Sequence, residues 1–548
     1  MAIYAELLGE GPPHSHRMRR TGAAPWALLA VLALGAALRL LYLGRESLWY
    51  DETYSVYWAQ RSLWGDLSDV HPPLYNALLH FWMQLFGTSE AAARSLSALF
   101  GMASIYLTYR VASTLFDRRV GLVAAFLSSF SLLGIHYSME ARSYSLLLML
   151  SLLSYLYFVR IIQGDRSKTS FLFYVMSNTL MVYTHLFGLF ILASQVVYLA
   201  LFRWRAISVR FVVAQAVTAA LFLPWLSNLF SGDRLSRLAW LQEPTFGELL
   251  STLKAHMGNL SAIAPYAGKP QLVPLQQPLF YLFLLMSLVG LFSGARLTSL
   301  RRRRFAVFSE GTPGAPLLLV WLVTPILLPF FISRLFMPIY ILRYTIAASP
   351  ALFILVALGI CRWKVTAVAL SISGLFLFLS LPALSYYYTH PHKEQWREAA
   401  QLVEKNAAEG DAVVVNCDGP EVLPPLEYYH FGSIEPVVLR ATDWSPERVG
   451  AFLERVSQDK ERLWLVSSYG QGSQAVRDLL KQEYRLIQTN EFVGLSVDLF
   501  FMVEGNGQRT APLLHVPVHQ QPLGQIEAEP DGCNTQGQSP PVAVPLTV

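Results

Sequence analysis

Two adjacent carboxylates open the first polar stretch of the sequence after a long apolar run. They are Asp51 and Glu52, in YDETY at residues 50–54. A second polar run, DVHPPLY at residues 69–75, follows soon after. A carboxylate in such a loop can take a proton from an acceptor hydroxyl. The tryptophans and tyrosines around the acidic pair favour a functional site at a membrane surface, although a solvated turn would also account for two acids.

Three later motifs place further polar groups where apolar segments end. They are HYSMEARSY at residues 136–144, YTHLFG at residues 183–188 and ILRY at residues 341–344. Their candidate functional residues are Glu140, Arg142, His185, Arg343 and Tyr344. Each has a simpler explanation, namely a self-satisfied glutamate–arginine pair, a packing histidine, and an arginine whose head group reaches the membrane interface.

Arginines and carboxylates on one face of a helical body would suit a particular chemistry. A guanidinium group binds two phosphate oxygens at once and stabilises the charge on a leaving phosphate. A neighbouring carboxylate can accept the proton of the attacking hydroxyl. The combination predicts transfer of a group from a lipid-linked phosphate donor.

The composition indicates that a membrane protein carries these residues. Of the 548 residues, 53% are hydrophobic and 14% are charged, against about 45–50% apolar and about 25% charged in soluble proteins. The apolar residues form long blocks, which argues against a soluble enzyme. The net charge of +5 is modest and the basic residues lie between the blocks, which argues against a nucleic-acid-binding protein.

The apolar blocks predict an α-helical polytopic protein with about eleven transmembrane helices. The blocks are residues 25–43, 92–115, 119–136, 143–162, 169–184, 186–202, 208–230, 276–293, 315–333, 339–360 and 364–385. The segment 71–87 is apolar but short and interrupted by polar residues. We expect an interfacial or re-entrant helix there.

Basic residues predict the orientation of these helices. If the N-terminus lies inside, the inside loops carry most of the Lys and Arg, as at residues 301–304, and the short outside loops carry few. This is the pattern of the positive-inside rule. The acidic loop, the three later motifs, the 231–275 loop and the C-terminal region then lie on the outer face.

The composition changes near residue 389. Helices are predicted at 393–406, 445–458 and 472–482, and strands at 411–416, 462–467, 484–489 and 492–503. This alternation indicates a small α/β domain. The predicted organisation is a cytoplasmic N-terminal lead at 1–24, a transmembrane catalytic domain at 25–388, an extracytoplasmic α/β domain at 389–505 and a disordered tail at 506–548.

The cysteines predict neither a metal site nor a disulfide framework. Cys361, Cys417 and Cys533 are far apart and show no metal-ligand spacing. Two adjacent acids offer fewer oxygen ligands than a hard divalent cation usually takes, so no cofactor is predicted and dependence on a divalent metal stays open.

The ordered set of motifs resembles the membrane glycosyltransferases of the GT-C class. The resemblance is to bacterial relatives of the dolichyl-phosphate-mannose protein mannosyltransferases (family 39-like) and of the lipid A aminoarabinose transferase. It covers roughly residues 25–390 and leaves out the C-terminal domain. It implies the GT-C fold and an inverting transferase that moves a sugar from a polyprenyl-phosphate donor on the outer face of the bacterial inner (plasma) membrane.

The resemblance also implies roles for the motif residues. Asp51 matches the catalytic base of the first outer loop, with Glu52 as its partner. Glu140, Arg142 and Arg343 match residues near the donor sugar or phosphate, and we add His185 and Tyr344 to this group. The residues expected to shape the site are His71, Pro72, Pro73 and Tyr75. The mannosyltransferases carry a sugar-binding MIR domain in a central outer loop, and the 231–275 loop is too short for one, which argues against a protein acceptor.

Two other classes of function are compatible with parts of the sequence. A transporter or flippase of a lipid-linked saccharide would need interrupted helices with polar groups near the membrane midplane. A non-catalytic scaffold would present the α/β domain to a partner and would leave Asp51, Glu140 and Arg343 apart. The sequence names neither the sugar nor the acceptor, which could be a lipid, a glycan or a protein.

Overall fold

The computed structural model describes residues 23–66, 70–229, 241–264, 268, 270–293, 314–417, 423–440, 446–458, 460–468 and 471–502. These residues belong to one compact unit that ends at Met502. The predicted tail at 506–548 lies outside the described residues, as does the predicted lead at 1–24 except for its last two residues.

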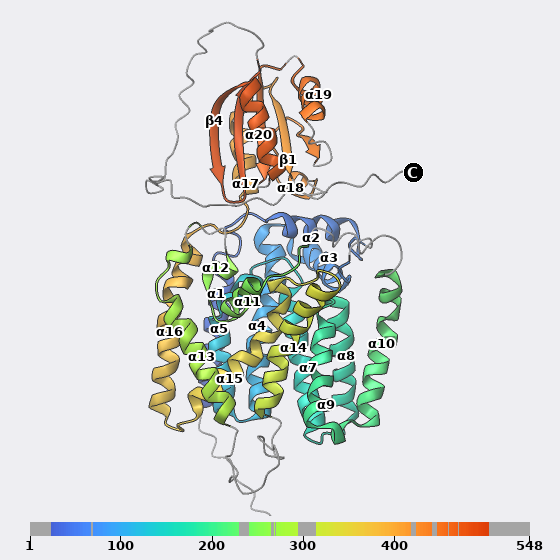
Figure 1. Cartoon of the computed structure of the whole chain (residues 1–548), viewed down its shortest axis with the longest axis vertical. Helices are drawn as coiled ribbons and strands as arrows, with labels where there is room; N and C mark the ends of the chain where they lie inside the picture. Colours follow the sequence, from blue (N-terminus) through green and yellow to red (C-terminus); the bar gives the residue numbers. More distant parts are fainter. Residues whose placement is uncertain are drawn as a thin grey trace, which may run out of the picture. The chain divides into compact units, whose positions relative to one another are not determined.

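Long helices make up most of the described chain up to residue 389 (Figure 1). They are α1 (Ala23–Leu40), α4 (Glu90–Leu115), α5 (Arg118–Ser129), α7 (Tyr144–Ile162), α8 (Lys168–Thr184), α9 (Gly188–Phe202), α10 (Val209–Leu229), α13 (Gln276–Ser293), α14 (Gly314–Leu335), α15 (Ser349–Cys361) and α16 (Thr366–Thr389). Shorter helices connect them: α2 (Tyr50–Arg61), α3 (Leu74–Phe86), α6 (Leu132–Ser138), α11 (Phe246–His256), α12 (Leu260–Ile263) and the 3₁₀ segments η1 (Trp204–Ala206), η3 (Pro270–Leu272) and η4 (Leu342–Ala348).

The protein is a multi-pass membrane protein by the length and apolarity of its helices. Among the described residues, five helical segments can each cross a membrane, and a bent pair raises the number to six. The five are Tyr144–Ile162, Val209–Asn228, Gly314–Leu335, Leu342–Cys361 and Thr366–Thr389. Helices α1, α9 and α13 are apolar but shorter. The figure of about eleven crossings stays a prediction.

The bent pair is α5 and α6, which form a 61° bend where the sequence predicts one span at 119–136. Arg39 of α1 is buried at this break and donates hydrogen bonds to the carbonyl oxygens of Ser128 (3.3 Å) and Ser129 (2.8 Å) and to Ser138 Oγ (3.2 Å). The last carbonyls of a helix lack partners within the helix. Arg39 supplies those partners at the end of α5 and thereby fixes the direction in which α6 leaves it.

Close packing between α13 and α15 depends on a pair of glycines. A Cβ atom at Gly290 would lie 2.0 Å from the carbonyl oxygen of Leu355, and one at Gly359 would lie 2.1 Å from the carbonyl oxygen of Met286. Small residues allow the backbones of membrane helices to approach this closely. Any side chain at either position would force the two helices apart.

A five-stranded sheet follows residue 411 and confirms the predicted small C-terminal sheet domain. Its strands are β1 (Ala412–Cys417), β2 (Val437–Arg440), β3 (Arg462–Ser468), β4 (Arg485–Phe492) and β5 (Leu495–Phe501). The order is β2-β1-β3-β5-β4, with β1 parallel to β2 and β3, and β5 antiparallel to β3 and β4. The helices of this region are α17 (Trp396–Asn406), α18 (Leu423–Tyr428), α19 (Pro446–Ser457) and α20 (Gln471–Glu483).

Alternation along β1 gives the sheet two apolar faces. Val414 packs in a cluster with Leu453 of α19 and Leu480 of α20. Val413, on the other face, belongs to the cluster that contains Trp396 of α17. Helices therefore cover both faces, which is why β1 and β3 each contain a run of four apolar residues.

Two parts of the sequence hold more structure than predicted. The 231–275 segment, predicted as a loop, contains α11 and α12. In α11, Thr245 and Glu248 form a reciprocal cap of the first turn, the S/T-x-x-E signature of a helix start. Helix α18 and strand β2 are also additional to the prediction. The first residue of the helix predicted at 445–458, Ser445, lies outside the described residues.

Candidate active site

Three predicted site residues come from separate elements at one end of the long helices. Asp51 lies in the first turn of α2, Arg142 lies in the connection between α6 and α7, and Arg343 lies in η4. Figure 1 shows α2, α3 and α11 at this end. The N-terminus of a helix attracts negative charge, and Asp51 occupies such a position.

Asp51 faces both arginines. Its Oδ2 lies 3.3 Å from Nη2 of Arg343 and 3.9 Å from Nη2 of Arg142. Arg142 is held in place by hydrogen bonds from its Nη1 to the carbonyl oxygen of Asp51 (3.3 Å) and to Ser55 Oγ (3.1 Å). The side chains of Asp51, Arg142 and Arg343 keep 19%, 13% and 21% of their surface exposed. The Asp51 carboxylate therefore has a cation on each side, and part of its surface is still accessible.

The hydrogen bonding of Asp51 is incomplete. Its Oδ2 accepts no hydrogen bond from the described residues, and the Nε atoms of Arg142 and Arg343 have no acceptor there either. Burial alone would lower the pKa of Arg142, but Tyr144 and Asp51 raise it, so the guanidinium stays charged. The cluster thus holds an available acceptor beside two available donors.

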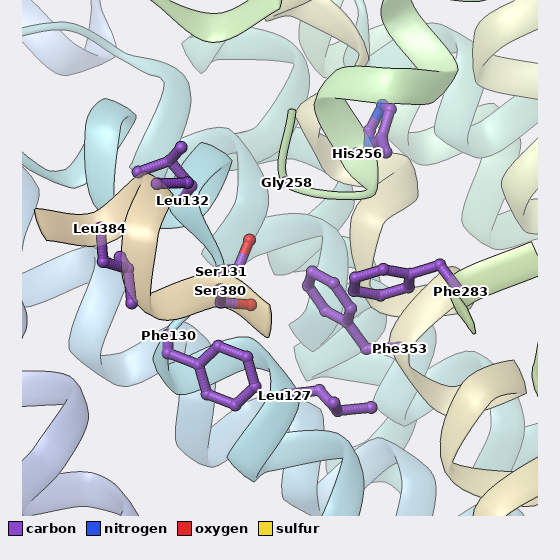
Figure 2. Close-up of a pocket in the computed structure, with 11 residues that line it drawn as sticks. Leu127, Phe130, Ser131, Leu132, His256, Gly258, Phe283, Phe353, Ser380 and Leu384 are labelled. Atoms are coloured by element: carbon purple, nitrogen blue, oxygen red, sulfur yellow. The ribbon is translucent and has the colours of Figure 1, made fainter. Parts of the chain in front are cut away.

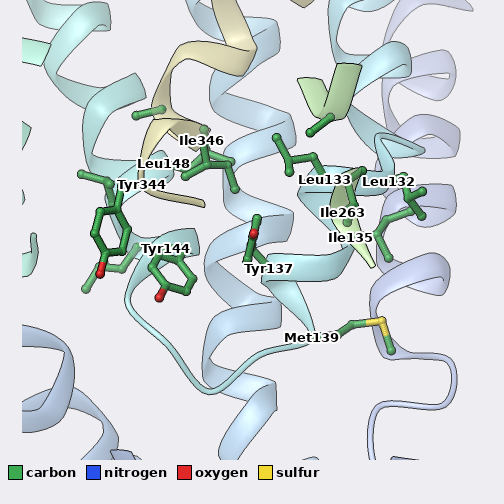
Figure 3. Packing of buried hydrophobic residues seen from close by; sticks show 14 of the residues in the cluster. Leu132, Leu133, Ile135, Tyr137, Met139, Tyr144, Leu148, Ile263, Tyr344 and Ile346 are labelled. Atoms are coloured by element: carbon green, nitrogen blue, oxygen red, sulfur yellow. The ribbon is translucent and has the colours of Figure 1, made fainter. Parts of the chain in front are cut away.

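Aromatic rings surround Arg343. The guanidinium carbon lies 5.6 Å from the ring centre of Trp49, 6.0 Å from that of Tyr144 and 5.8 Å from that of Tyr344. Figure 3 shows Tyr144 and Tyr344 at the edge of a packed apolar cluster that also contains Tyr137. Aromatic faces attract a cation within about 6 Å. These rings hold the guanidinium at the boundary between the apolar core and the polar cluster.

Glu52 lies in a different environment from Asp51. Its carboxylate is completely buried and accepts bidentate hydrogen bonds from Arg94, at 2.7 and 2.6 Å. It also accepts hydrogen bonds from the backbone N–H of Ala141 (2.8 Å) and from Lys393 Nζ (3.1 Å). The prediction that Glu52 joins Asp51 in the reaction does not fit this arrangement, because the lone pairs of Glu52 are already engaged.

The electrostatics of Glu52 agree with this reading. Burial would raise its pKa, but the charges of Arg94 and Lys393 lower the pKa to about 2. Glu52 is therefore ionised at neutral pH and has a structural role. Its bond to Ala141 fixes the connection between α6 and α7, next to Arg142.

Arg94 and Lys393 are site residues that the sequence prediction missed. Arg94 donates to the carbonyl oxygens of Leu43 (3.0 Å), Glu46 (2.7 Å) and Ser47 (2.8 Å) as well as to Glu52. It thereby ties the segment before α2 to α4. Arg94 lies near the start of an apolar block, where an arginine usually indicates a side chain that reaches the membrane interface. Only its burial inside the protein shows that Arg94 has a different role.

Glu140 is buried and does not pair with Arg142, so the self-satisfied local pair considered above is wrong. Its Oε1 lies 3.2 Å from Nε2 of His136 and 4.0 Å from Nζ of Lys393. Burial would raise the pKa of Glu140, whereas His136 and Lys393 lower it. The Oε2 atom has no hydrogen-bond partner among the described residues. Among the described residues, the Glu140 carboxylate is thus paired with His136 and Lys393 and forms no ion pair with Arg142 or Arg343.

The remaining predicted residues form a ring cluster around Tyr344. The ring of His185 lies 4.4 Å from that of Tyr344 and 5.7 Å from that of His71. The Tyr344 hydroxyl lies 3.5 Å from Nε2 of His71. Because Arg343 precedes Tyr344 in η4, this ring cluster is adjacent to the Asp51 cluster.

Tyr75 and the two prolines have a supporting role in this region. Pro72 and Pro73 are buried, and Pro73 begins helix α3. The Tyr75 hydroxyl lies 2.8 Å from Ser97 Oγ, which donates to the carbonyl oxygen of Arg142 (3.1 Å). Tyr75 therefore positions the Arg142 loop rather than contacting the cluster directly. Asp69, in the same motif, lies outside the described residues.

The donor atoms around Asp51 do not suit a metal ion. Among the described residues, no group of three or more His, Cys, Asp or Glu could hold one. The immediate neighbours of the Asp51 carboxylate are two guanidinium groups, which compete with a cation for its charge. We therefore derive no catalytic step through a metal.

A separate pocket lies deeper among the helices and is mostly apolar. Figure 2 shows Phe130, Phe283 and Phe353 around it, with Ser131, His256 and Ser380 as polar members. None of the residues that line this pocket belongs to the predicted site.

Comparison with known proteins gives the class of the fold. The structure resembles that of ArnT from Cupriavidus metallidurans in the apo state, with a TM-score of 0.57 and 13% identity, over 87% of this chain and 98% of that one. The same protein bound to undecaprenyl phosphate gives a TM-score of 0.54, at 13% identity and the same coverage of 87% and 98%. The apo oligosaccharyltransferase of Archaeoglobus fulgidus gives a TM-score of 0.52 at 13% identity, over 90% of this chain and 76% of that one.

The chain has the fold of the GT-C class of membrane glycosyltransferases, and the resemblance predicted from its motifs is confirmed. Within that class, residues 70–227 match the model of the family described as dolichyl-phosphate-mannose-protein mannosyltransferase. This match includes Glu140, Arg142 and His185 and ends before Arg343. No curated protein sequence matched the chain.

Proposed function

We propose that the protein is an inverting glycosyltransferase that moves a sugar from a polyprenyl-phosphate donor to an acceptor on the outer face of the membrane. The observation that carries the proposal is the Asp51 cluster, in which a reachable carboxylate forms ion pairs with Arg142 and Arg343 through an oxygen, Oδ2, that accepts no hydrogen bond from the described residues. The family match and the GT-C fold make glycosyl transfer the appropriate chemistry for such a cluster.

In the proposed reaction, Asp51 accepts the proton of the acceptor hydroxyl as its oxygen attacks the anomeric carbon. The bond from the anomeric carbon to the phosphate oxygen breaks, and its electron pair remains on the polyprenyl phosphate. Arg343 and Arg142 stabilise the charge on that phosphate through bidentate hydrogen bonds. A single displacement of this kind inverts the anomeric centre, whereas a carboxylate nucleophile in two steps would retain it.

The other charged residues have supporting roles in this proposal. Glu52 and Arg94 fix α2 and the Arg142 loop relative to each other. His185, His71 and Tyr344 line the region beside the arginines, where the donor sugar would lie. The binding of undecaprenyl phosphate to ArnT supports a donor of the polyprenyl-phosphate type. The outer-face location rests on the distribution of basic residues between the apolar blocks.

The test is Asp51→Asn in the full-length protein. The donor is first identified as the lipid-linked sugar that accumulates in a strain lacking the gene, and transfer from it is then measured in detergent. Asparagine keeps the shape of the side chain but cannot accept the proton, so we expect kcat to fall by about 10²–10⁴-fold. Elution as a single folded species and an unchanged melting temperature would establish that the variant is intact.

Glu483→Gln, an exposed carboxylate in α20, is the matched control and should retain full activity. Transfer by Asp51→Asn at the wild-type rate would remove Asp51 from the mechanism. A product with retained configuration at the anomeric carbon would contradict the single displacement.

A transporter of lipid-linked saccharide is the alternative, and the break between α5 and α6 is the feature that could favour it. However, the charge at this break is engaged in structure. Arg39 donates to the carbonyl oxygens of Gly35, Ser128 and Ser129 and to Ser138 Oγ. Its hydrogen bonds hold the bend together, so the break does not present a charge for a passing substrate.

A further inference from the structure

A polar groove of about 620 Å³ lies on the surface between α2 and α18. Its walls include Thr53, Tyr57, Gln60 and Arg61 of α2 on one side and Glu427 and Tyr428 of α18 on the other. Its volume is within the range of small-molecule binding sites, about 300–1,000 Å³. Apart from Thr88 and Ser89, the residues that line this groove lie outside the family match at residues 70–227, and none of them belongs to the predicted site.

The groove and the Asp51 cluster occupy opposite faces of α2. Asp51 and Ser55, which contact Arg142, are separated by one helical turn and share a face. Thr53, Tyr57 and Gln60 form a second stripe at i, i+4 and i+7, rotated about 200° from the first. A helix is about 10 Å thick. A ligand in the groove is therefore separated from the reacting atoms by the width of α2.

The side chains of the groove are suited to a neutral polyol. Tyr57 and Tyr428 offer apolar ring surface that matches the C–H face of a sugar ring, although one face of Tyr57 is covered by the Arg61 guanidinium. Gln60 is exposed and adds an amide group that donates and accepts hydrogen bonds, whereas the buried Thr53 hydroxyl already donates to the carbonyl oxygen of Tyr50 (2.8 Å). The charges are balanced, because Arg61 of α2 forms an ion pair with Glu427 of α18. An anionic or cationic ligand would find no excess of opposite charge at this pair.

Hydrogen bonds and a cation–π contact hold the walls of the groove in place. The Tyr428 hydroxyl donates to the carbonyl oxygen of Thr88 (2.7 Å), and the next residue, Tyr429, accepts from the backbone N–H of Leu48 (2.7 Å). The Arg61 guanidinium lies 3.6 Å above the ring centre of Tyr57. These contacts fix both walls before any ligand binds, and a fixed site costs less to occupy.

We propose that this groove binds a short neutral oligosaccharide, the glycan part of the acceptor, at a site distinct from the transfer site. This inference rests on the proposed glycosyltransferase function. The acceptor would then be a glycan or a glycan-bearing molecule. Binding in the groove would hold the acceptor against α2 while another of its hydroxyls reaches Asp51 around the end of the helix.

The first experiment measures binding by the full-length protein in nanodiscs to an array of defined neutral oligosaccharides built from glucose, galactose, mannose and arabinose. We expect at least one series to bind, with affinity reduced tenfold or more in Tyr57→Ala and in Gln60→Ala. Tyr281→Ala, an exposed tyrosine of α13, should bind as the wild type does. Asp51→Asn should also bind normally, because it lies on the other face of α2.

Three outcomes would overturn the proposal: no binding to any neutral oligosaccharide, binding that survives both groove substitutions, or binding that Asp51→Asn abolishes.

A transfer assay separates this proposal from the proposed function. We expect Tyr57→Ala to raise KM for a glycan-bearing acceptor tenfold or more and to leave kcat within twofold. If the protein transfers no sugar, the proposed function fails while the binding result still decides the groove.

Discussion

At the scale of single residues, two neighbouring carboxylates have opposite environments. Glu52 accepts hydrogen bonds from Arg94, Lys393 and the backbone of Ala141, and its pKa is lowered to about 2. Asp51 keeps an unbonded oxygen and part of its surface exposed. The difference follows from helix geometry, because consecutive residues point about 100° apart on α2. One carboxylate therefore faces the core and the other faces the cluster.

Glu52→Gln should destabilise the protein in a pH-dependent way. The ionised carboxylate of the wild type contributes stability that is fully present above its unfolded pKa of 4.5 and is lost as the pH falls toward its folded pKa of about 2. A shift of this size corresponds to about 3 kcal/mol. We expect a large difference in melting temperature between variant and wild type at about pH 6, and a smaller one at about pH 3.

Glu409→Gln, which changes an exposed carboxylate, is the control for this measurement and should melt as the wild type does at both pH values. A difference between Glu52→Gln and wild type that stays constant with pH would contradict the assignment of a lowered pKa to Glu52.

Residue types and motifs in the sequence were enough to single out Asp51, Arg142 and Arg343, which the structure brings together. They were not enough to separate Asp51 from Glu52, since adjacent acids look alike until the helix that carries them is oriented. Arg94 and Lys393 were missed for a related reason. A single basic residue at the edge of an apolar block has the same pattern whether it reaches water or a buried carboxylate.

At the scale of elements, α11 holds the segment that carries Arg343. His256 is the last residue of α11. Its Nε2 lies 2.9 Å from Thr345 Oγ1, and its Nδ1 lies 2.8 Å from Ser349 Oγ. Thr345 donates its own proton to the carbonyl oxygen of Leu342, so it must accept from Nε2–H. Nδ1 is then the unprotonated nitrogen, and it accepts from Ser349. Burial lowers the pKa of His256 to about 4, which keeps this neutral form.

His256→Ala should therefore affect both stability and catalysis. Losing two hydrogen bonds and opening a small cavity should cost about 2 to 4 kcal/mol in the free energy of unfolding. We expect kcat to fall because η4, and Arg343 with it, is less firmly positioned. His256→Gln, which can keep one hydrogen bond, should recover part of both losses. Ser251→Ala, a partly buried residue of the same helix, should change neither. Full activity in His256→Ala would show that α11 does not position Arg343.

Most elements were predictable because their patterns are local. The long apolar helices and the strands β1, β3, β4 and β5 follow from periodicity and apolar runs. Helix α11 was not predicted although its capping box is legible in the sequence, because a loop was expected between two spans. The bend between α5 and α6 depends on Arg39 of α1, a distant partner that no local pattern reveals.

At the scale of the whole molecule, the segment that leads into the sheet also completes the site. Lys393 lies between α16 and α17, is buried, and donates to Glu52 Oε2 (3.1 Å) and to the carbonyl oxygen of Met139 (2.7 Å). It also lies 4.0 Å from Glu140. Burial lowers the pKa of Lys393, and the three carboxylates Glu52, Glu140 and Glu46 act against that shift. Folding of the site and attachment of the C-terminal region are therefore coupled.

Lys393→Met should reveal that coupling. The substitution keeps much of the side-chain volume but leaves buried carboxylates without one of their cations, which should cost about 3 to 5 kcal/mol. We expect a lower melting temperature for the whole protein. Lys405→Met, an exposed lysine of α17, is the control and should melt as the wild type does. Equal melting temperatures for the two variants would show that Lys393 does not join the two regions.

The contact between Gly290 and Gly359 has a consequence for lateral access from the bilayer. Because a Cβ atom at either glycine would meet the backbone of the facing helix, α13 and α15 leave no room for a lipid chain where these glycines lie. The span Val209–Asn228, in contrast, is only 28% buried within the protein. The donor proposed above carries a long polyprenyl tail and would have to pass between helices to reach Arg343. We expect its entry beside α10 rather than between α13 and α15.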